Sequence, residues 1–213
     1  NGSYGGVYVT GGTFTMSGGT ISGNTASNNG GGVFIDKYAA FTMGNGTISG
    51  NTAEYGGGVF VHDSEFTMND GTISGNTVSY AGGGVNVDSS TFTMTDGEIS
   101  GNTAASGGGV FVFDDTFTMN GGTISGNVAT SGGGVNVRGG TFTMTGGTIS
   151  GNTANYGGGV YLYGGVEFAM QGGYFGGEIE NSGTVSISGG YFAEEFDTAY
   201  LAENCDLHDI FAL

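Results

Sequence analysis

Short runs in which hydrophobic and polar residues alternate recur along the whole chain. Their first occurrences read GVYV, TFTM and GTIS, and clusters of Gly, Asn and Asp separate one run from the next. Alternation with a period of two predicts β-strands, and no run is long enough to predict a helix. The element GGGV marks the repeat, and its valine falls at Val7, Val33, Val59, Val85, Val110, Val135 and Val160, spaced by 26 residues three times and then by 25 three times.

Three strands in a repeat of this length, with no helical crossover, are typical of a solenoid. We therefore expect an all-β fold: a right-handed parallel β-helix with three strands per coil, about 25 residues per coil and about seven to eight coils. After Met170 the repeat loses its GNTA turn, so we assign residues 1–170 to β-helix repeats and residues 171–213 to shortened final coils and a C-terminal cap. Val185 and Ile187 are expected to point inward, and residues 197–211 are expected to form a short helix with Asp197 as N-cap.

Positions that accept only apolar residues are predicted to face the core. In the second run these are a phenylalanine and a methionine, and all seven methionines of the chain occupy this one site. In the third run the inward residue is an isoleucine, and in the first run two aliphatic residues flank the middle site. Stacked coils therefore predict internal phenylalanine and methionine ladders at the roughly 4.8 Å spacing of neighbouring strands.

The middle site of the first run holds an aromatic residue in most coils and asparagine in two, which indicates an outward site. Together with two tyrosines that precede GGG, these rings are the candidate ligand-binding residues: Tyr8, Phe34, Tyr55, Phe60, Phe111, Tyr156 and Tyr161. Rings beside amide and acidic groups favour a sugar-binding surface, while an exposed apolar stripe also fits a protein partner. The rings could equally cover the sheet without binding any ligand.

One asparagine follows the third run in each repeat: Asn24, Asn51, Asn76, Asn102, Asn127 and Asn152. Asparagines stacked at a turn can pass amide hydrogen bonds from coil to coil. The glycine before each of them permits a backbone conformation that other residues disfavour. We predict a structural asparagine ladder here rather than a ligand site.

The charge of the chain limits the classes of partner that it could bind. The chain has 19 acidic residues but only Lys37 and Arg138 as basic ones, for a formal net charge of −17. Two basic residues cannot neutralise nucleic acid or an anionic membrane surface, and no apolar stretch is long enough to predict membrane insertion. Cys205 is the single cysteine, so we expect neither an internal disulfide nor a zinc site.

Aspartates recur in register at two turns of the repeat. They are the candidate Ca²⁺ ligands: Asp36, Asp63, Asp88, Asp114, Asp70 and Asp96. Hard oxygen ligands at this spacing could hold Ca²⁺, although the full ligand string of calcium-binding repeats is absent and solvated acidic turns are the alternative. No other cofactor is expected.

Catalysis is not expected. A β-helix lyase needs a basic residue beside clustered aspartates, and the two basic residues lie about four coils apart. Asp114 and Asp115 form a carboxylate pair that could suggest inverting glycoside hydrolysis. For nucleophilic catalysis by a triad, His62 and His208 would each need a serine or cysteine partner, and the sequence shows none.

Outward threonines of the second run form T-x-T pairs that resemble ice-binding faces. The pairs are Thr13 with Thr15, Thr91 with Thr93, Thr116 with Thr118, and Thr141 with Thr143. Ala40 and Glu65 interrupt this array, and threonine is in any case a favourable outward strand residue.

The string ISGNTA followed by GGGV is similar to the paired repeats FxxN and GGA(I/L/V) of polymorphic outer-membrane proteins and related bacterial adhesin-like β-helix proteins. Residues 21–26 with 31–33, and 149–154 with 157–160, match that pattern with Ile for Phe and Gly for Ala. The resemblance covers about residues 1–170 and implies a bacterial protein that is secreted or attached to the cell surface and acts in adhesion.

We accordingly expect a non-enzymatic, adhesin-like or structural module of a longer parent chain. It would bind a host or environmental glycan, or an extracellular protein, by repeating one weak contact in every coil. A carbohydrate-active β-helix enzyme, either a lyase or a hydrolase of polysaccharides, and an ice-binding protein are the alternatives.

Overall fold

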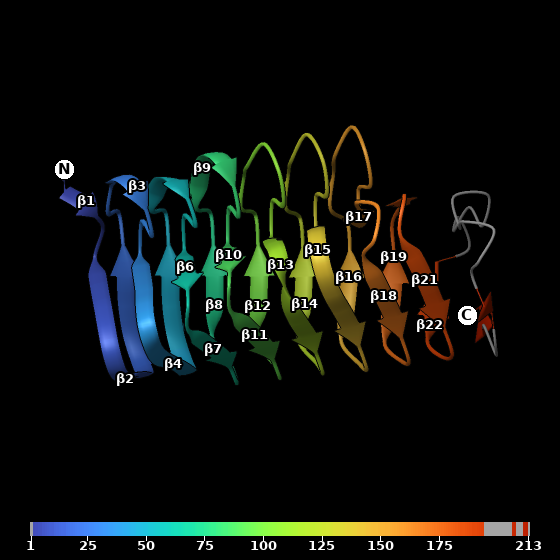
Figure 1. Ribbon diagram of the computed structural model, residues 1–213, viewed down its shortest axis with the longest axis horizontal. Coiled ribbons are helices and arrows are strands. Elements are labelled where there is room, and N and C mark those ends of the chain that lie inside the picture. The colour runs from blue at the N-terminus through green and yellow to red at the C-terminus, as the bar shows by residue number, and fades with distance from the viewer. Residues whose placement is uncertain (1, 194–205, 208–210, 213) are drawn as a thin grey trace.

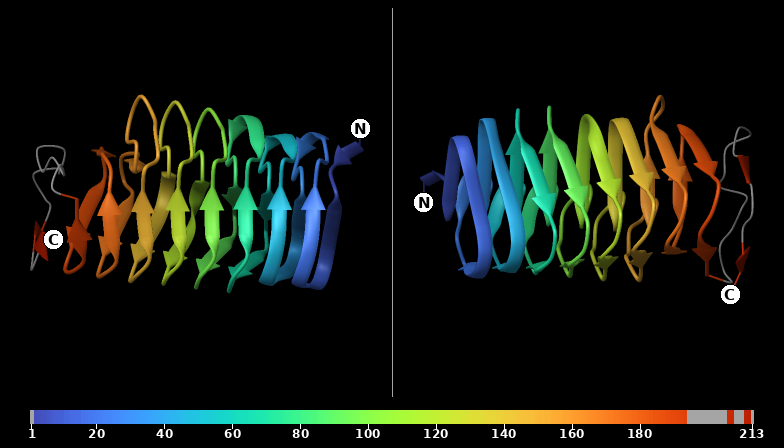
Figure 2. Two further views of the ribbon diagram at one scale, coloured as in Figure 1. Left: turned by 180° about the vertical axis from the view of Figure 1, so that it is seen from behind. Right: turned by 90° about the horizontal axis from the view of Figure 1, so that it is seen from below.

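A computed structural model describes residues 2–193, 206–207 and 211–212 of this chain. Every regular element in these ranges is a β-strand, and the strands stack along one axis into a solenoid of about seven turns with about 25 residues per turn (Figure 1). The same stack is seen from behind and from below (Figure 2). The predicted parallel β-helix is confirmed.

Three strand runs per coil build three faces of the solenoid. In the first two coils all three runs join into the long strands β2 (Val7–Ser22) and β4 (Val33–Ser49). The first face continues through β6 (Val59–His62), β10 (Val85–Asp88), the start of β13 (Val110–Met119) and of β15 (Val135–Met144), β17 (Val160–Leu162) and β20 (Ile179–Asn181).

The second and third faces complete each coil. The second face consists of β7 (Glu65–Met68), β11 (Thr91–Met94), the ends of β13 and β15, β18 (Glu167–Met170), β21 (Thr184–Ile187) and β23 (Asp206–Leu207). The third consists of β8 (Thr72–Ser74), β12 (Glu98–Ser100), β14 (Thr123–Ser125), β16 (Thr148–Ser150), β19 (Tyr174–Gly176), β22 (Tyr191–Phe192) and β24 (Phe211–Ala212).

Identical residues of successive coils pair in parallel register. Phe92 lies between Phe66 and Phe117, and its coil places Met94 and Ile99 in equivalent rows. Ring centroids along the internal phenylalanine ladder, from Phe14 to Phe168, are 4.7 to 5.0 Å apart. Buried phenylalanines each contribute about 1.5–3 kcal/mol relative to an exposed ring, so this core holds the coils together.

The asparagines form a second ladder beside the core. The backbone N–H and the Nδ2 of Asn76 both donate to Oδ1 of Asn102, each over 2.9 Å, and Nδ2 also donates to the carbonyl of Ile48. The same pattern links Asn24 to Asn51, Asn51 to Asn76, Asn102 to Asn127 and Asn127 to Asn152. The glycines that precede them have φ between 61° and 66°, so a residue with a side chain would be strained there.

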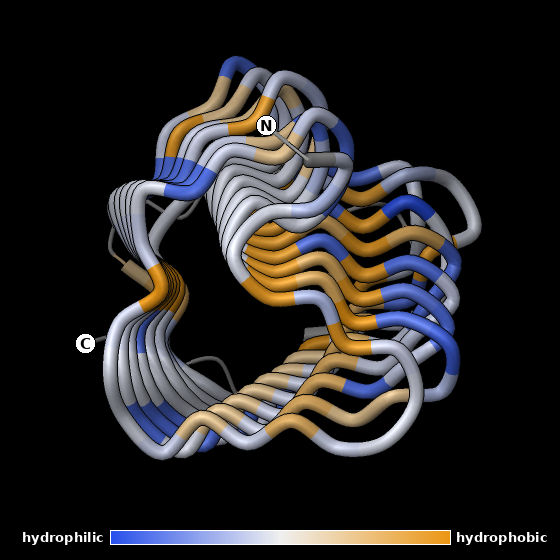
Figure 3. Tube along the Cα trace, turned by 90° about the vertical axis from the view of Figure 1, so that its left-hand side faces the viewer, coloured by the Kyte–Doolittle hydropathy of each residue, from blue (hydrophilic) through white to orange (hydrophobic). Residues whose placement is uncertain are grey.

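A projecting segment between each ladder asparagine and the following GGG was not predicted. We call it the overhang; it contains β1 (Gly2–Tyr4), β3 (Ala26–Asn29), β5 (Thr52–Tyr55) and β9 (Thr77–Ala81), and continues as isolated bridges in later coils. Small apolar residues of the overhang, namely Ala26, Ala53, Val78 and Ala104, form a second buried cluster. Viewed along the axis, the overhang rises above the first face and gives the coil an L-shaped outline (Figure 3).

The coils shorten toward the C-terminus. Val160 pairs with Ile179 and Phe168 with Val185, so the spacing falls to 19 and 17 residues. Val185 and Ile187 are buried as predicted. The predicted helix over 197–211 is wrong at two places, because residues 206–207 and 211–212 are strands that pair with β21 and β22 and thus extend the ladder. The remainder of that segment, including Asp197, lies outside the described residues.

Candidate functional site

A groove of about 520 Å³ runs across several coils between the overhang and the first face. Tyr55, Tyr80 and Ser106 line it from the overhang, and the outward side chains of the first face form its floor. The overhang is held along the axis by backbone bonds between coils, such as Ser106 N–H to the carbonyl of Tyr80 at 2.9 Å. The groove wall therefore repeats with the coils beneath it.

The middle-site aromatic residues point away from the core but are more buried than predicted. Phe34 and Phe60 retain only 5% and 6% of their surface, so these two rings do not form part of an exposed apolar stripe. The first glycine of each GGG packs directly on this site: a Cβ on Gly56, whose φ is +60°, would lie 2.6 Å from Cβ of Phe60. The overhang thus descends onto these rings and covers them.

The other candidate rings keep more exposure. Tyr8 and Tyr156 are exposed, while Tyr55, Phe111 and Tyr161 are half-buried. Tyr55 stacks on Tyr80 with ring centroids 5.2 Å apart. The candidates therefore divide, with Tyr55, Phe60 and Phe111 in the groove, and Tyr8, Phe34, Tyr156 and Tyr161 outside its lining.

Sequence reasoning missed the residues at the open rim of the groove. Phe113 and Tyr163 are exposed, and Arg138 lies between them with its Cζ 5.8 Å from the centre of the Phe113 ring and 5.4 Å from that of Tyr163. All three occupy one outward row of the first face, two residues after the middle site. That regular offset was the available signal, but the row mixes aromatic and charged residues and so did not stand out.

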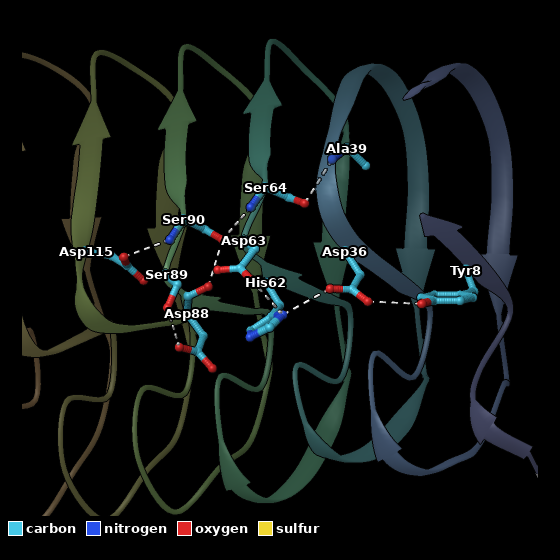
Figure 4. Close-up of polar contacts among 10 residues, drawn as sticks. All are labelled: Tyr8, Asp36, Ala39, His62, Asp63, Ser64, Asp88, Ser89, Ser90 and Asp115. Atoms are coloured by element: carbon cyan, nitrogen blue, oxygen red, sulfur yellow. Dashed lines mark hydrogen bonds and ion pairs between the residues drawn. The ribbon is translucent and has the colours of Figure 1, made fainter. Parts of the chain in front are cut away.

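In the N-terminal coils Asp36 and His62 of the same outward row form a polar chain with Tyr8 of the middle site. Tyr8 donates its hydroxyl hydrogen to Asp36 Oδ2 over 3.0 Å, and His62 Nδ1 lies 3.0 Å from Asp36 Oδ1 (Figure 4). The hydrogen bond with Asp36 raises the pKa of His62 against the opposing effect of burial. Burial alone would raise the pKa of Asp36, but the hydrogen bonds from His62, Tyr8 and the Lys37 backbone together lower it.

The aspartates predicted as Ca²⁺ ligands do not converge on one point. Within residues 2–193 no three His, Cys, Asp or Glu side chains gather in a way that could hold a metal ion. Asp70 and Asp96 accept hydrogen bonds from the next glycine N–H, and Asp88 accepts one from Ser89. Asp63 and Asp114 have φ of 46° and 58°, which places them at a left-handed turn position. The four aspartates after the first face do not share one row either: Asp36 and Asp88 flank His62 in the outward row, whereas Asp63 and Asp114 follow one residue later.

Asp115 belongs to a ladder at this same corner. Ala39 N–H donates to Ser64 Oγ, Ser64 N–H to Ser90 Oγ, and Ser90 N–H to Asp115 Oδ1 over 2.7 Å (Figure 4). Asp115 is 9% exposed and its Oδ2 is buried without a hydrogen-bond partner. Burial raises its pKa to about 6, against the hydrogen bond from the Ser90 backbone. Its carboxylate ends a structural ladder, and this arrangement does not resemble an open catalytic pair with Asp114.

The outward threonines of the second face do align in rows. Thr91, Thr116 and Thr141 pair directly, as do Thr93, Thr118 and Thr143. Glu65 pairs with both Thr91 and Ala40 and so interrupts the first row. An uninterrupted threonine array thus spans only part of this face.

The fold defines a parallel β-solenoid that carries a lateral aromatic groove. Residues 1–119 match the family model of the right-handed β-helix region, and the chain belongs to that family. The comparison with curated proteins and the comparison with solved structures each gave no match. No helix in the described ranges is long and apolar enough to cross a membrane.

Proposed function

We propose that this chain is a non-enzymatic, adhesin-like module of a bacterial protein that is secreted or attached to the cell surface. The groove, whose exposed rings lie on a stack of hydrogen-bonded coils, carries this proposal. Tyr80 is 53% exposed and Phe113 40%, in a groove that also offers the polar groups of Asn86, Asp88 and Arg138. Such a mixture of rings and a few polar groups suits a glycan or a peptide segment.

Multivalence follows from the repeat. Equivalent outward positions of the first face recur in each coil, about 4.8 Å apart, and the ladders keep them in line. Weak contacts that engage together on one ligand give an avidity greater than any single contact. An extended glycan or an extracellular protein segment lying along the groove could use several coils at once.

Three observations support a non-catalytic role. Asp115 is committed to the corner ladder, its neighbour Asp114 occupies a strained turn, and His62 is paired with Asp36. None of these groups lines the aromatic groove. Asp88 is the single carboxylate among the groove-lining residues, whereas glycoside hydrolysis uses a pair of carboxylates beside the bound sugar.

The test is binding to a broad panel of glycans and extracellular matrix proteins, in Ca²⁺ and again in chelator. We expect saturable binding that the double variant Tyr80→Ala/Phe113→Ala abolishes and that chelator leaves unchanged. Tyr38→Ala is the matched control, because Tyr38 is 89% exposed and lies outside the groove. Equal loss in the control, or full binding by the double variant, would exclude the groove as the site.

Binding to no member of the panel would exclude adhesion by this module and would favour a role as a spacer. Crystal shaping in a freezing-hysteresis assay would instead support the threonine rows as an ice-binding face. Release of reducing or unsaturated ends from a polysaccharide panel would overturn the non-enzymatic proposal.

A further inference from the structure

Arg138 is placed in the groove like a ligand-binding residue. It is one of only two basic residues in a chain with a formal net charge of −17. Its side chain is exposed and lines both the aromatic groove and an adjoining hollow of about 350 Å³ next to Gly139 and Gly164. The single positive charge of this region thus lies where an occupant of the groove would pass.

The rings of Phe113 and Tyr163 lie on either side of the guanidinium group of Arg138 along the stack. They belong to the coils before and after Arg138, and Cζ lies within 6 Å of both ring centres. A cation–π contact with a ring does not use the N–H donors of a guanidinium group, so they remain available to a ligand. No ion pair or hydrogen bond with another described residue engages these donors.

A free guanidinium edge between two rings matches a carboxylate attached to a sugar. The planar donors can bind both carboxylate oxygens, while the apolar faces of sugar rings can pack on the exposed rings beside them. A phosphate monoester would place more negative charge near Asp88 and Asp114, which line the same two hollows. The surrounding charge therefore favours a ligand that brings one negative charge over one that brings many.

We propose that the groove selects an otherwise neutral oligosaccharide that bears a single carboxylate, held by Arg138 between Phe113 and Tyr163. This inference rests on the proposed glycan-binding function and specifies its ligand class. It also assigns Arg138 as the residue that determines specificity, whereas Tyr80 supplies general affinity.

The experiment compares glycans that differ only in a carboxylate. Matched pairs are printed on one array: galactose- with galacturonate-terminated, glucose- with glucuronate-terminated, and lactose with sialyl-lactose, with a tri-galacturonate added. Positive pairs are then titrated in solution against the whole chain. We expect one or more carboxylated members to bind about 10- to 100-fold more tightly than their neutral partners, the range of a charge-assisted hydrogen-bonded contact.

Two variants test whether Arg138 causes the preference for the carboxylated glycan. Arg138→Gln keeps a polar side chain of similar length and is expected to bring each carboxylated member down to the affinity of its neutral partner. Arg138→Lys keeps the charge and is expected to retain a weaker, more salt-sensitive preference. Circular dichroism and melting of both variants establish that the coils are intact.

Four outcomes would each overturn a different part of the proposal. Equal binding of both members of every pair overturns the carboxylate inference and leaves glycan binding standing. A preference that persists in Arg138→Gln overturns the assignment of Arg138. Strongest binding of the tri-galacturonate overturns the single-charge argument. Binding of no glycan at all is the failure of the glycan-binding part of the proposed function, on which this inference rests.

Discussion

At the scale of single residues, Asp115 shows how one ladder position can carry a free-energy cost. Equivalent sites in the preceding coils hold Ser64 and Ser90, whose hydroxyl oxygens accept the same backbone N–H that Asp115 accepts with a carboxylate. A buried carboxylate with one unpartnered oxygen is destabilised when it is charged. The next coil has Gly140 at this site, so the ladder of side chains ends there.

The variant Asp115→Ser is predicted to be more stable than the natural chain above pH 6. The pKa of Asp115 is raised from 3.8 to about 6, so between these values the folded state binds more protons than the unfolded state. Stability therefore falls as pH rises through this window and stays reduced above it. We expect a gain of about 1 kcal/mol at pH 7.5, below the full value for such a shift because water screens the group.

Urea unfolding of Asp115→Ser at pH 4 and pH 7.5 measures this effect. Asp114→Ser removes the same formal charge from the exposed neighbouring side chain and controls for overall repulsion. If both variants gain equally at pH 7.5, or if the gain of Asp115→Ser is the same at pH 4, burial of Asp115 is not the cause.

Ser89 illustrates a different cost at the same corner. Its φ is 54°, and the aligned turn position is taken by Asp63 and Asp114, also left-handed, and then by glycine at Gly139. A left-handed conformation costs a residue with a side chain about 1–2 kcal/mol. We predict that Ser89→Gly unfolds at a higher urea concentration than Ser89→Ala, by about 1 kcal/mol in free energy. Equal stability of the two variants would show that this corner relaxes without strain.

At the scale of elements, the asparagine ladder couples one coil to the next. Asn102 is fully buried; its Oδ1 accepts two hydrogen bonds from Asn76, and its Nδ2 donates to Ile73 and Asn127. Asn24 begins the ladder, is partly exposed, and accepts no bond from a preceding asparagine. The two positions share a residue type and a turn but differ in the number of partners left unpaired when the side chain is removed.

We predict that Asn102→Ala destabilises the protein by about 3–5 kcal/mol, because several buried polar groups lose their partners together. Asn24→Ala is expected to cost about 1 kcal/mol. Thermal unfolding followed by circular dichroism compares the two variants. Similar losses at both sites would mean that the ladder adds nothing beyond each separate turn.

Sequence predicted the elements well because each one is repeated. A single Phe or Met does not predict a fold. Seven of each at the same position of the repeat predict coils stacked so that these side chains line the core, and Phe92 does pair with Phe66 and Phe117. The overhang was missed because its apolar residues, such as Ala26 and Ala53, are small and give no strand pattern of their own. The rim of the groove was missed for a related reason: Arg138, Phe113 and Tyr163 become neighbours only when coils of mixed residue type are stacked.

At the scale of the whole molecule, the solenoid is a one-dimensional stack in which each coil touches only its neighbours. Stability in such a stack is approximately a sum of coil and interface contributions, so it need not be uniform along the axis. The central coils contain the phenylalanine, methionine and asparagine ladders together. Toward the C-terminus the coils are 17 to 20 residues long, and Asn152 is the last asparagine of its ladder.

We therefore predict a gradient of amide hydrogen exchange along the axis. Amides of β13 and β15 should exchange slowest, those of β21 faster, and the outermost strand β2 faster than its equivalents in the interior, since local opening needs only one interface there. In Asn102→Ala, faster exchange should spread from the mutated coil to the adjacent coils and fade with distance. Hydrogen exchange with peptide-level mass spectrometry measures both patterns. The contrary result is one protection factor shared by all coils and changed equally in all of them by the substitution. The solenoid would then open as one cooperative unit, and the groove would be no more rigid than the ends of the stack.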